Sequence, residues 1–190
     1  MTGRRARPDV HEGGFRERAL LNRWRFWLPP LVGTATVASA DQATKLIVLA
    51  TRPDITIIPG FFSLTFGTNT GVAFGLFRSF PLMVTLVGIG LLGAILIYLV
   101  RQAHVATRLE KVALALVAGG ASGNVIDRLR LGHVVDYLDF YAGAYRWPAF
   151  NLADSAISVG VVLLAATSLR RGAAPTEPTR PRRREETDVR

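Results

Sequence analysis

Residues 151–169 read NLADSAISVGVVLLAATSL, an apolar stretch with a polar beginning. A helix needs about 20 residues, each rising about 1.5 Å, to cross a hydrocarbon core of roughly 30 Å. The stretch therefore predicts a membrane-spanning helix. Its polar residues recur at helical spacing and share one face: Asn151, Asp154, Ser155 and Ser158. Asn151 is a good helix cap, but a carboxylate at membrane depth is costly, which makes Asp154 a candidate functional residue.

Three more stretches have the length and the apolar character of membrane helices. They are residues 26–50, 81–100 and 111–127. The last of them ends in small and polar residues, GGASGN at 119–124, which let helices pack closely but weaken its hydropathy. Almost half of the chain, 49%, is hydrophobic, and the apolar residues concentrate in these stretches. We expect an all-α polytopic membrane protein with four transmembrane helices.

Positive charge is concentrated at the two ends of the chain. Residues 1–25 and residues 170–190 each contain seven Arg, and the connector at 101–111 adds Arg and Lys. An even number of spans puts both termini on one side, and the positive-inside bias makes that side the cytoplasm. We expect a basic cytoplasmic tail, a membrane domain over 26–169 and a second, disordered basic cytoplasmic tail. Because the tails lack interleaved aromatic residues, we expect no nucleic-acid partner.

The remaining loops, residues 51–80 and 128–150, are expected on the extracytoplasmic side. In the first loop, residues 55–58 and 61–66 are rich in β-branched and aromatic residues and flank a Pro-Gly turn signal. The second loop is rich in Tyr, Phe and Trp, a composition suited to the water–lipid interface. We expect a small extracytoplasmic β-sheet from the first loop and a short interfacial helix from the second.

Two further polar stripes lie at the outer ends of predicted helices. Asp41 and Lys45 are four residues apart, in the order that favours an intrahelical pair. Mutual neutralisation and support of an active site both remain open for this pair. Asn124, Asp127 and Arg128 also share one helical face. For Asp127, an ion pair with Arg128 or a helix cap is a sufficient structural explanation.

Asp136 and Asp154 are carboxylates beside membrane segments, and neither has a Lys or Arg next to it in the sequence. Two carboxylates a few ångströms apart share one proton and titrate as a pair. The ionised one can activate a water while the protonated one polarises a carbonyl, as in aspartic proteases. The chain contains no Cys, and this chemistry needs no metal or cofactor. The residues alone leave open whether Asp127, Asp136 or Asp139 partners Asp154, and we expect Asp139 to be solvated.

Three alternatives are weaker. GASG at residues 120–123 matches the Gly-x-Ser-Gly motif of rhomboid serine proteases, but the one candidate partner, His133, follows in a polar loop and the spans are too few. A Ser-Lys dyad of Ser39 and Lys45 fails because six residues place them about 240° apart around a helix. A small proton-coupled transporter would also bury polar residues between helices, but four spans without an inverted repeat do not fit it.

The ordered set of polar blocks resembles the signal peptidase II family of bacterial lipoprotein signal peptidases, which are membrane aspartic peptidases. The resemblance covers about residues 26–169, and the two tails lie outside it. Any one block alone is a weak signal, but five in this order are specific. The blocks are DQATK at 41–45, NTGVAFG at 69–75, GGASGNVIDR at 119–128, VVDY at 134–137 and FNLAD at 150–154.

This resemblance implies that Asp136 and Asp154 are the catalytic dyad. It further implies hydrolysis of the signal peptide of a prolipoprotein, on the N-terminal side of a Cys that carries a diacylglyceryl group, at the bacterial inner membrane. The partners are then the prolipoprotein and membrane lipid, and a monomer suffices because the site is complete in one chain. Positions implied to bind substrate or support the site are Asp41, Lys45, Asn69, Gly71, Asn124, Asp127, Arg128 and Asn151.

Overall fold

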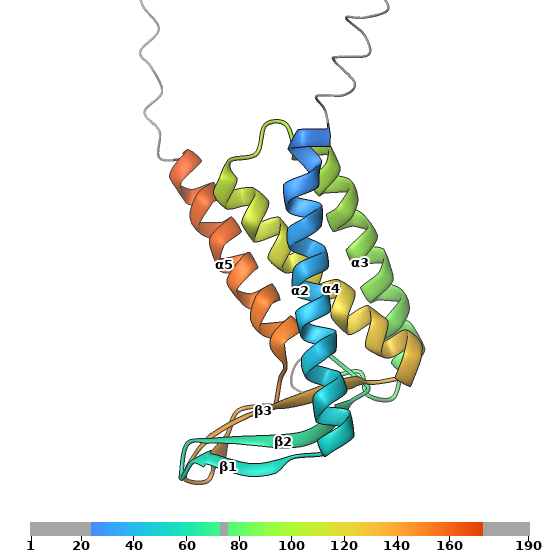
Figure 1. Ribbon diagram of the computed structural model, residues 1–190, viewed down its shortest axis with the longest axis vertical. Coiled ribbons are helices and arrows are strands. Elements are labelled where there is room, and N and C mark those ends of the chain that lie inside the picture. The colour runs from blue at the N-terminus through green and yellow to red at the C-terminus, as the bar shows by residue number, and fades with distance from the viewer. Residues whose placement is uncertain (1–23, 73–75, 173–190) are drawn as a thin grey trace, which may run out of the picture.

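In the described part of the chain, four helices stand side by side, with a small sheet across one end of the bundle (Figure 1). The fold is that of a computed structural model, which describes residues 24–72 and 76–172. Most of the two predicted basic tails, and residues 73–75 of the NTGVAFG block, lie outside the described residues. The described chain begins and ends at the end of the bundle that is opposite the sheet (Figure 1).

The four helices coincide with the four predicted stretches. Three of those described, α3, α4 and α5, are long and apolar enough to cross a membrane. The helix α2 is 28 residues long but is not among these three, because Asp41, Gln42 and Lys45 lower its hydropathy. The bounds are α2 Trp24–Thr51, α3 Pro81–Gln102, α4 Arg108–Leu131 and α5 Leu152–Gly172.

The helix α4 lies at the centre of the bundle and packs against the other three helices. Its small residues are what allow this packing. A Cβ atom on Gly119 would lie 2.6 Å from the side chain of Val37 on α2, and one on Gly120 would overlap the backbone of Ala153 on α5. The same run of small residues that weakens the hydropathy of α4 therefore lets α2 and α5 approach its backbone closely.

The sheet is antiparallel, with strand order β1-β2-β3-β4. The hairpin predicted around the Pro-Gly turn is confirmed as β1 and β2. The prediction of a short interfacial helix over the second loop is wrong, because that loop forms β3 and β4 instead. The strands are β1 Asp54–Ile58, β2 Phe62–Asn69, β3 Val134–Ala142 and β4 Tyr145–Arg146.

The prediction failed because contacts between distant segments fix the conformation of this loop. β3 completes the ladder of β2 along most of its length, and the ring of Phe140 stacks between those of Phe62 and Phe150, with centroid distances of 4.6 Å and 5.7 Å. An aromatic-rich loop is equally suited to an interfacial helix and to such a stacked strand. The free edge of β2 decides in favour of the strand, because it offers backbone partners that an isolated loop lacks.

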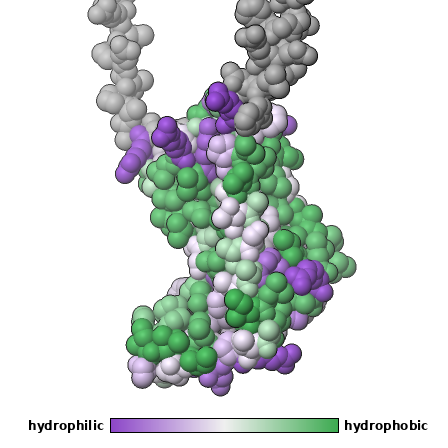
Figure 2. Space-filling view, in the orientation of Figure 1, coloured by the Kyte–Doolittle hydropathy of each residue, from purple (hydrophilic) through white to green (hydrophobic). Residues whose placement is uncertain are grey.

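A small apolar core joins the sheet to the bundle. Val48 of α2 packs with Val135 and Tyr137 of β3, and all three are buried. On the outer faces of the helices, by contrast, large apolar side chains are exposed. Figure 2 shows them over the bundle, with hydrophilic residues gathered at the end where the described chain begins and ends and again near the sheet. Such an exposed apolar surface is typical of a membrane protein.

Candidate active site

The first turn of α5, which carries Asp154, is held by side chains from α2, from β3 and from the residue that precedes the helix. The first N–H groups of a helix have no partner within the helix and must find one elsewhere. Here three successive N–H groups each donate to a side chain. The acceptors are the Tyr137 hydroxyl for Leu152 at 3.3 Å, Asp41 Oδ1 for Ala153 at 2.9 Å and Asn151 Oδ1 for Asp154 at 2.9 Å. The position of Asp154 is thus tied to both α2 and β3.

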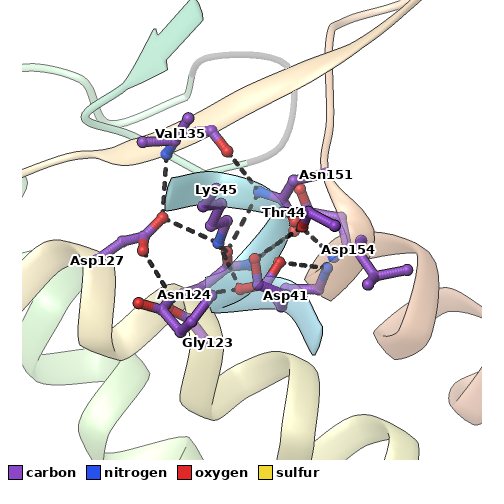
Figure 3. Close-up of polar contacts among 12 residues, drawn as sticks. Asp41, Thr44, Lys45, Gly123, Asn124, Asp127, Val135, Asn151 and Asp154 are labelled. Carbon is purple, nitrogen blue, oxygen red and sulfur yellow. Dashed lines mark hydrogen bonds and ion pairs between the residues drawn. The ribbon is translucent and has the colours of Figure 1, made fainter. Parts of the chain in front are cut away.

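Lys45 is buried at the centre of the polar cluster (Figure 3). Its Nζ lies 2.8 Å from Asp41 Oδ2 and 2.9 Å from Asp127 Oδ2, and it donates to Asn124 Oδ1 at 3.0 Å. An ammonium group has three donors, so Lys45 uses all of them. The predicted Asp41–Lys45 pair is present, and Asp127 shares it rather than pairing with Arg128.

Two asparagine amides connect this cluster to the remaining carboxylates. Because Lys45 can only donate, Asn124 turns its Oδ1 towards Lys45 and its Nδ2 towards Asp154. Asn124 Nδ2 donates to Asp154 Oδ1 at 2.7 Å. Asn151 Nδ2 donates to Asp136 Oδ1 at 2.9 Å and lies 3.3 Å from Asn124 Oδ1. Each amide therefore orients one of the two carboxylates.

The predicted residues Asn69, Gly71 and Arg128 form a turn beside the two carboxylates. Asn69 Oδ1 accepts a hydrogen bond from Gly71 N at 2.9 Å, and Arg128 Nη2 donates to Gly71 O at 2.7 Å. A Cβ atom on Gly71 would overlap the carbonyl of Leu76. The close backbone approach predicted for Gly71 is therefore present, and only glycine fits there.

A cleft of about 1050 Å³ opens beside the sheet and extends between α3, α4 and α5. Among the described carboxylates, Asp136 and Asp154 line it, whereas Asp41, Asp127 and Asp139 do not. The wall between the helices is mainly apolar. It includes Leu91 and Ile95 of α3, Val117 and Val125 of α4, and Ile157 of α5.

The electrostatics of Asp136 also suit proton transfer. Burial, and next the negative charge of Asp154, raise the pKa of Asp136 to about 7. Hydrogen bonds from Asn69 and Asn151 and the positive charge of Lys45 act in the opposite direction and do not cancel this rise. A carboxyl group that titrates near neutral pH can both hold and release a proton at working pH.

Every predicted site residue lies at the sheet end of the bundle, but one expectation is wrong and one contact was not foreseen. Asp139 was expected to be solvated, yet it is buried, with Oδ2 2.7 Å from Arg146 Nη1. Tyr137 was noted only as an interfacial aromatic, and its hydroxyl contacts α5. A tyrosine in an apolar strand carries no local signal for such a role. Within residues 24–72 and 76–172, no group of three or more His, Cys, Asp or Glu side chains could hold a metal ion.

The family model that matches this chain and two of its relatives are all described as signal peptidases. The family model described as signal peptidase (SPase) II matches residues 34–170. The lipoprotein signal peptidase of Syntrophus aciditrophicus (strain SB) is 40% identical over 152 residues, covering 74% of this chain and 92% of the relative. That of Burkholderia mallei (strain SAVP1) is 46% identical over 151 residues, covering 76% and 90%.

Two solved structures, each described as a bacterial membrane enzyme structure by the in meso method, share the fold. The first has a TM-score of 0.69 and 29% sequence identity, and the match covers 78% of this chain and 92% of that one. The second has a TM-score of 0.65 and 31% identity, with coverage of 75% and 93%.

Proposed function

The chain belongs to the signal peptidase II family, and we propose that it removes the signal peptide from prolipoproteins, cutting on the N-terminal side of a diacylglyceryl-modified Cys. One observation carries the assignment of the site. Of the described carboxylates in the polar cluster, Asp136 and Asp154 line the cleft, while Asp41 and Asp127 both pair with Lys45 and do not line it.

In the proposed aspartic mechanism the two carboxylates share one proton, which we place on Asp136, whose pKa burial and next the charge of Asp154 raise, and Asp154 is the base. Asp154 takes a proton from a water molecule as the water oxygen attacks the scissile carbonyl, and Asp136 donates a hydrogen bond to the carbonyl oxygen. The tetrahedral intermediate then collapses. Its C–N bond breaks as the proton that Asp154 took from the water passes to the leaving nitrogen of the lipidated Cys.

The supporting residues hold the side chains of Asp136 and Asp154 in place. Asn124 and Asn151 each donate to one carboxylate, which keeps the pair in register without neutralising its charge. Arg128 lines the cleft and supports the turn at Gly71. A group that is held by several such bonds needs little reorganisation when the reaction begins.

A lipid-bearing substrate also fits the shape of the site. The cleft combines carboxylates at the sheet end with an apolar wall between α3, α4 and α5, so the acyl chains lie along the helices while the peptide lies at the dyad. The exposed Ile55, Ile57 and Phe61 of the first hairpin rest on the membrane surface. The site is complete in one chain, so a monomer is sufficient.

The function is tested with purified protein in lipid vesicles. We expect it to release the signal peptide from a prolipoprotein that carries the diacylglyceryl group, as measured by mass spectrometry of both products. The same precursor without lipid is the control and should be cleaved far more slowly. Equal cleavage of both precursors, or of neither, would contradict the proposal.

We further propose that α2 also crosses the membrane, which gives four spans in the bacterial inner membrane. Both termini are then cytoplasmic, and the dyad lies near the extracytoplasmic face. Two observations support this topology: the described chain begins and ends at one end of the bundle (Figure 1), and in the sequence the Arg-rich segments adjoin these two ends.

The topology is tested with alkaline phosphatase, which is active only outside the cytoplasm. Fused after Arg171, it is expected to be inactive. Inserted at Gly143, in the exposed turn between β3 and β4, it is expected to be active. The reverse pattern, or equal activity at both positions, would overturn the proposed orientation.

A further inference from the structure

The hydroxyl of Tyr137 is part of a directed chain of hydrogen bonds. Leu152 N donates to the Tyr137 hydroxyl at 3.3 Å, and this hydroxyl donates to Thr44 Oγ1 at 2.9 Å. Thr44 Oγ1 in turn donates to the carbonyl oxygen of Asp41 at 2.8 Å. Each hydroxyl thus gives one hydrogen bond and receives one, so both are satisfied in a single arrangement.

This chain joins the three elements that carry the site. Tyr137 directly follows Asp136 on β3, Leu152 begins the helix that carries Asp154, and Thr44 belongs to α2. Burial raises the pKa of the Tyr137 hydroxyl above its usual value, so the hydroxyl keeps the proton that it donates. The link is therefore maintained throughout the neutral pH range.

We propose that Tyr137 is a positioning residue, whose hydroxyl acts with Thr44 to set the separation of Asp136 from Asp154. The inference rests on the proposed function, since it gives this separation a catalytic meaning. A merely structural role would require only that a buried hydroxyl have a partner. The partners found here are more specific, because one of them is the first N–H of α5, which no residue of that helix can satisfy.

Tyr141 provides the matched comparison within the same strand. It lies four residues further along β3 and therefore on the same face as Tyr137. Its hydroxyl lies 3.1 Å from Ser63 Oγ, within the sheet and away from the cleft-lining residues. Removing either hydroxyl takes one oxygen atom from β3. Of the two, the Tyr137 hydroxyl is hydrogen-bonded to α5 and α2, and the Tyr141 hydroxyl lies beside Ser63 of the sheet.

In Tyr137→Phe we expect kcat to fall about tenfold with KM nearly unchanged, since a displacement of about 1 Å can cost up to 10²-fold. The charged groups around Asp136 are Asp154 on α5, Lys45 on α2 and Arg128 on α4. Burial raises the pKa of Asp136 most, and the charge of Asp154 adds to this rise. As the two carboxylates separate, this effect weakens, so the titration midpoint of Asp136 moves to lower pH.

The deciding measurement is the infrared titration of the Asp136 carboxyl band, assigned by its loss in Asp136→Asn, because it needs no turnover. We expect a shift to lower pH in Tyr137→Phe and none in Tyr141→Phe. An unshifted midpoint in Tyr137→Phe would overturn the inference even if cleavage of prolipoprotein is normal. A shifted midpoint in a protein that cleaves no prolipoprotein would support the link and reject the proposed function.

Substitutions of Thr44 test the same inference if Tyr137→Phe fails to fold. Thr44→Val removes the acceptor of the Tyr137 hydroxyl while keeping the shape of the side chain, and it is expected to shift the same titration. Thr44→Ser retains the hydroxyl and is expected to behave as the wild type. Identical titrations in Thr44→Val and Thr44→Ser would show that the chain of hydroxyls does not position Asp136.

Discussion

Asp136→Asn and Asp154→Asn are each expected to lower kcat by at least about 10³-fold. An amide has nearly the shape of a carboxyl group, but it can neither take a proton from water nor share one with its partner. Both side chains line the cleft and accept hydrogen bonds from Asn151 and Asn124, so the substitutions change the chemistry more than the packing. The measurement is the rate of signal-peptide release from a diacylglyceryl-modified precursor.

Asp139→Asn is the matched control for this prediction. Asp139 lies on the same strand as Asp136 and is also buried, but it pairs with Arg146 and does not line the cleft. Because the Arg146 side chain is 64% exposed, water can solvate it when the carboxylate is lost. We expect this variant to retain most of its activity. Near-normal turnover in either dyad variant, with both proteins folded, would refute the assignment of the dyad.

Lys45→Met is expected to have the largest effect on stability. Without the ammonium group, the buried carboxylates of Asp41 and Asp127 have lost the cation that both contact. Breaking a buried ion pair by removing one partner costs about 3–5 kcal/mol, a large part of the roughly 5–15 kcal/mol by which a protein is stable. We expect a much lower unfolding temperature in detergent and a poor yield of folded protein.

Two further variants test whether the lower stability comes from the two buried carboxylates left without a cation, and not from the loss of any lysine. Lys111→Met changes the only other lysine of the chain, whose Nζ lies 5.5 Å from the ring centroid of Phe26, and it is expected to have a small effect. Lys45→Met combined with Asp127→Asn is expected to unfold at a higher temperature than Lys45→Met, since one of the two stranded charges is removed. An unfolding temperature of Lys45→Met equal to that of the wild type would contradict the account of the cluster.

The helices, the first hairpin and the polar stripes of the helices could be predicted from the sequence itself, whereas Asn69, Gly71 and the choice of Asp136 over Asp127 and Asp139 came from the family resemblance. These features depend on local properties: the length of an apolar run, the turn residues between strands and the spacing of polar residues along one helix. The same local reasoning failed for residues 134–146, because their strand conformation depends on the free edge of β2 and on the stacking of Phe140.

Local sequence patterns could not predict which carboxylates contact Lys45 and which line the cleft. The spacing of Asp41 and Lys45 predicted their pair, but nothing in the sequence spacing says whether Asp127 or Asp154 also contacts Lys45. Packing of α2 against α4 brings Asp127 to Lys45, although Asp127 and Lys45 are distant in sequence. That contact accounts for Asp127 as part of the supporting cluster rather than of the cleft.

The sequence by itself determined that this chain contains apolar helices long enough for a membrane and carries costly carboxylates at their ends, because hydropathy and helical spacing are properties of short segments. Only the tertiary structure decided which of those carboxylates line the cleft, because its walls come from segments that are distant in the sequence. Lys45 has three donors, and they face Asp41, Asp127 and Asn124. Asp136 and Asp154 instead line the cleft and accept hydrogen bonds from the amides of Asn151 and Asn124.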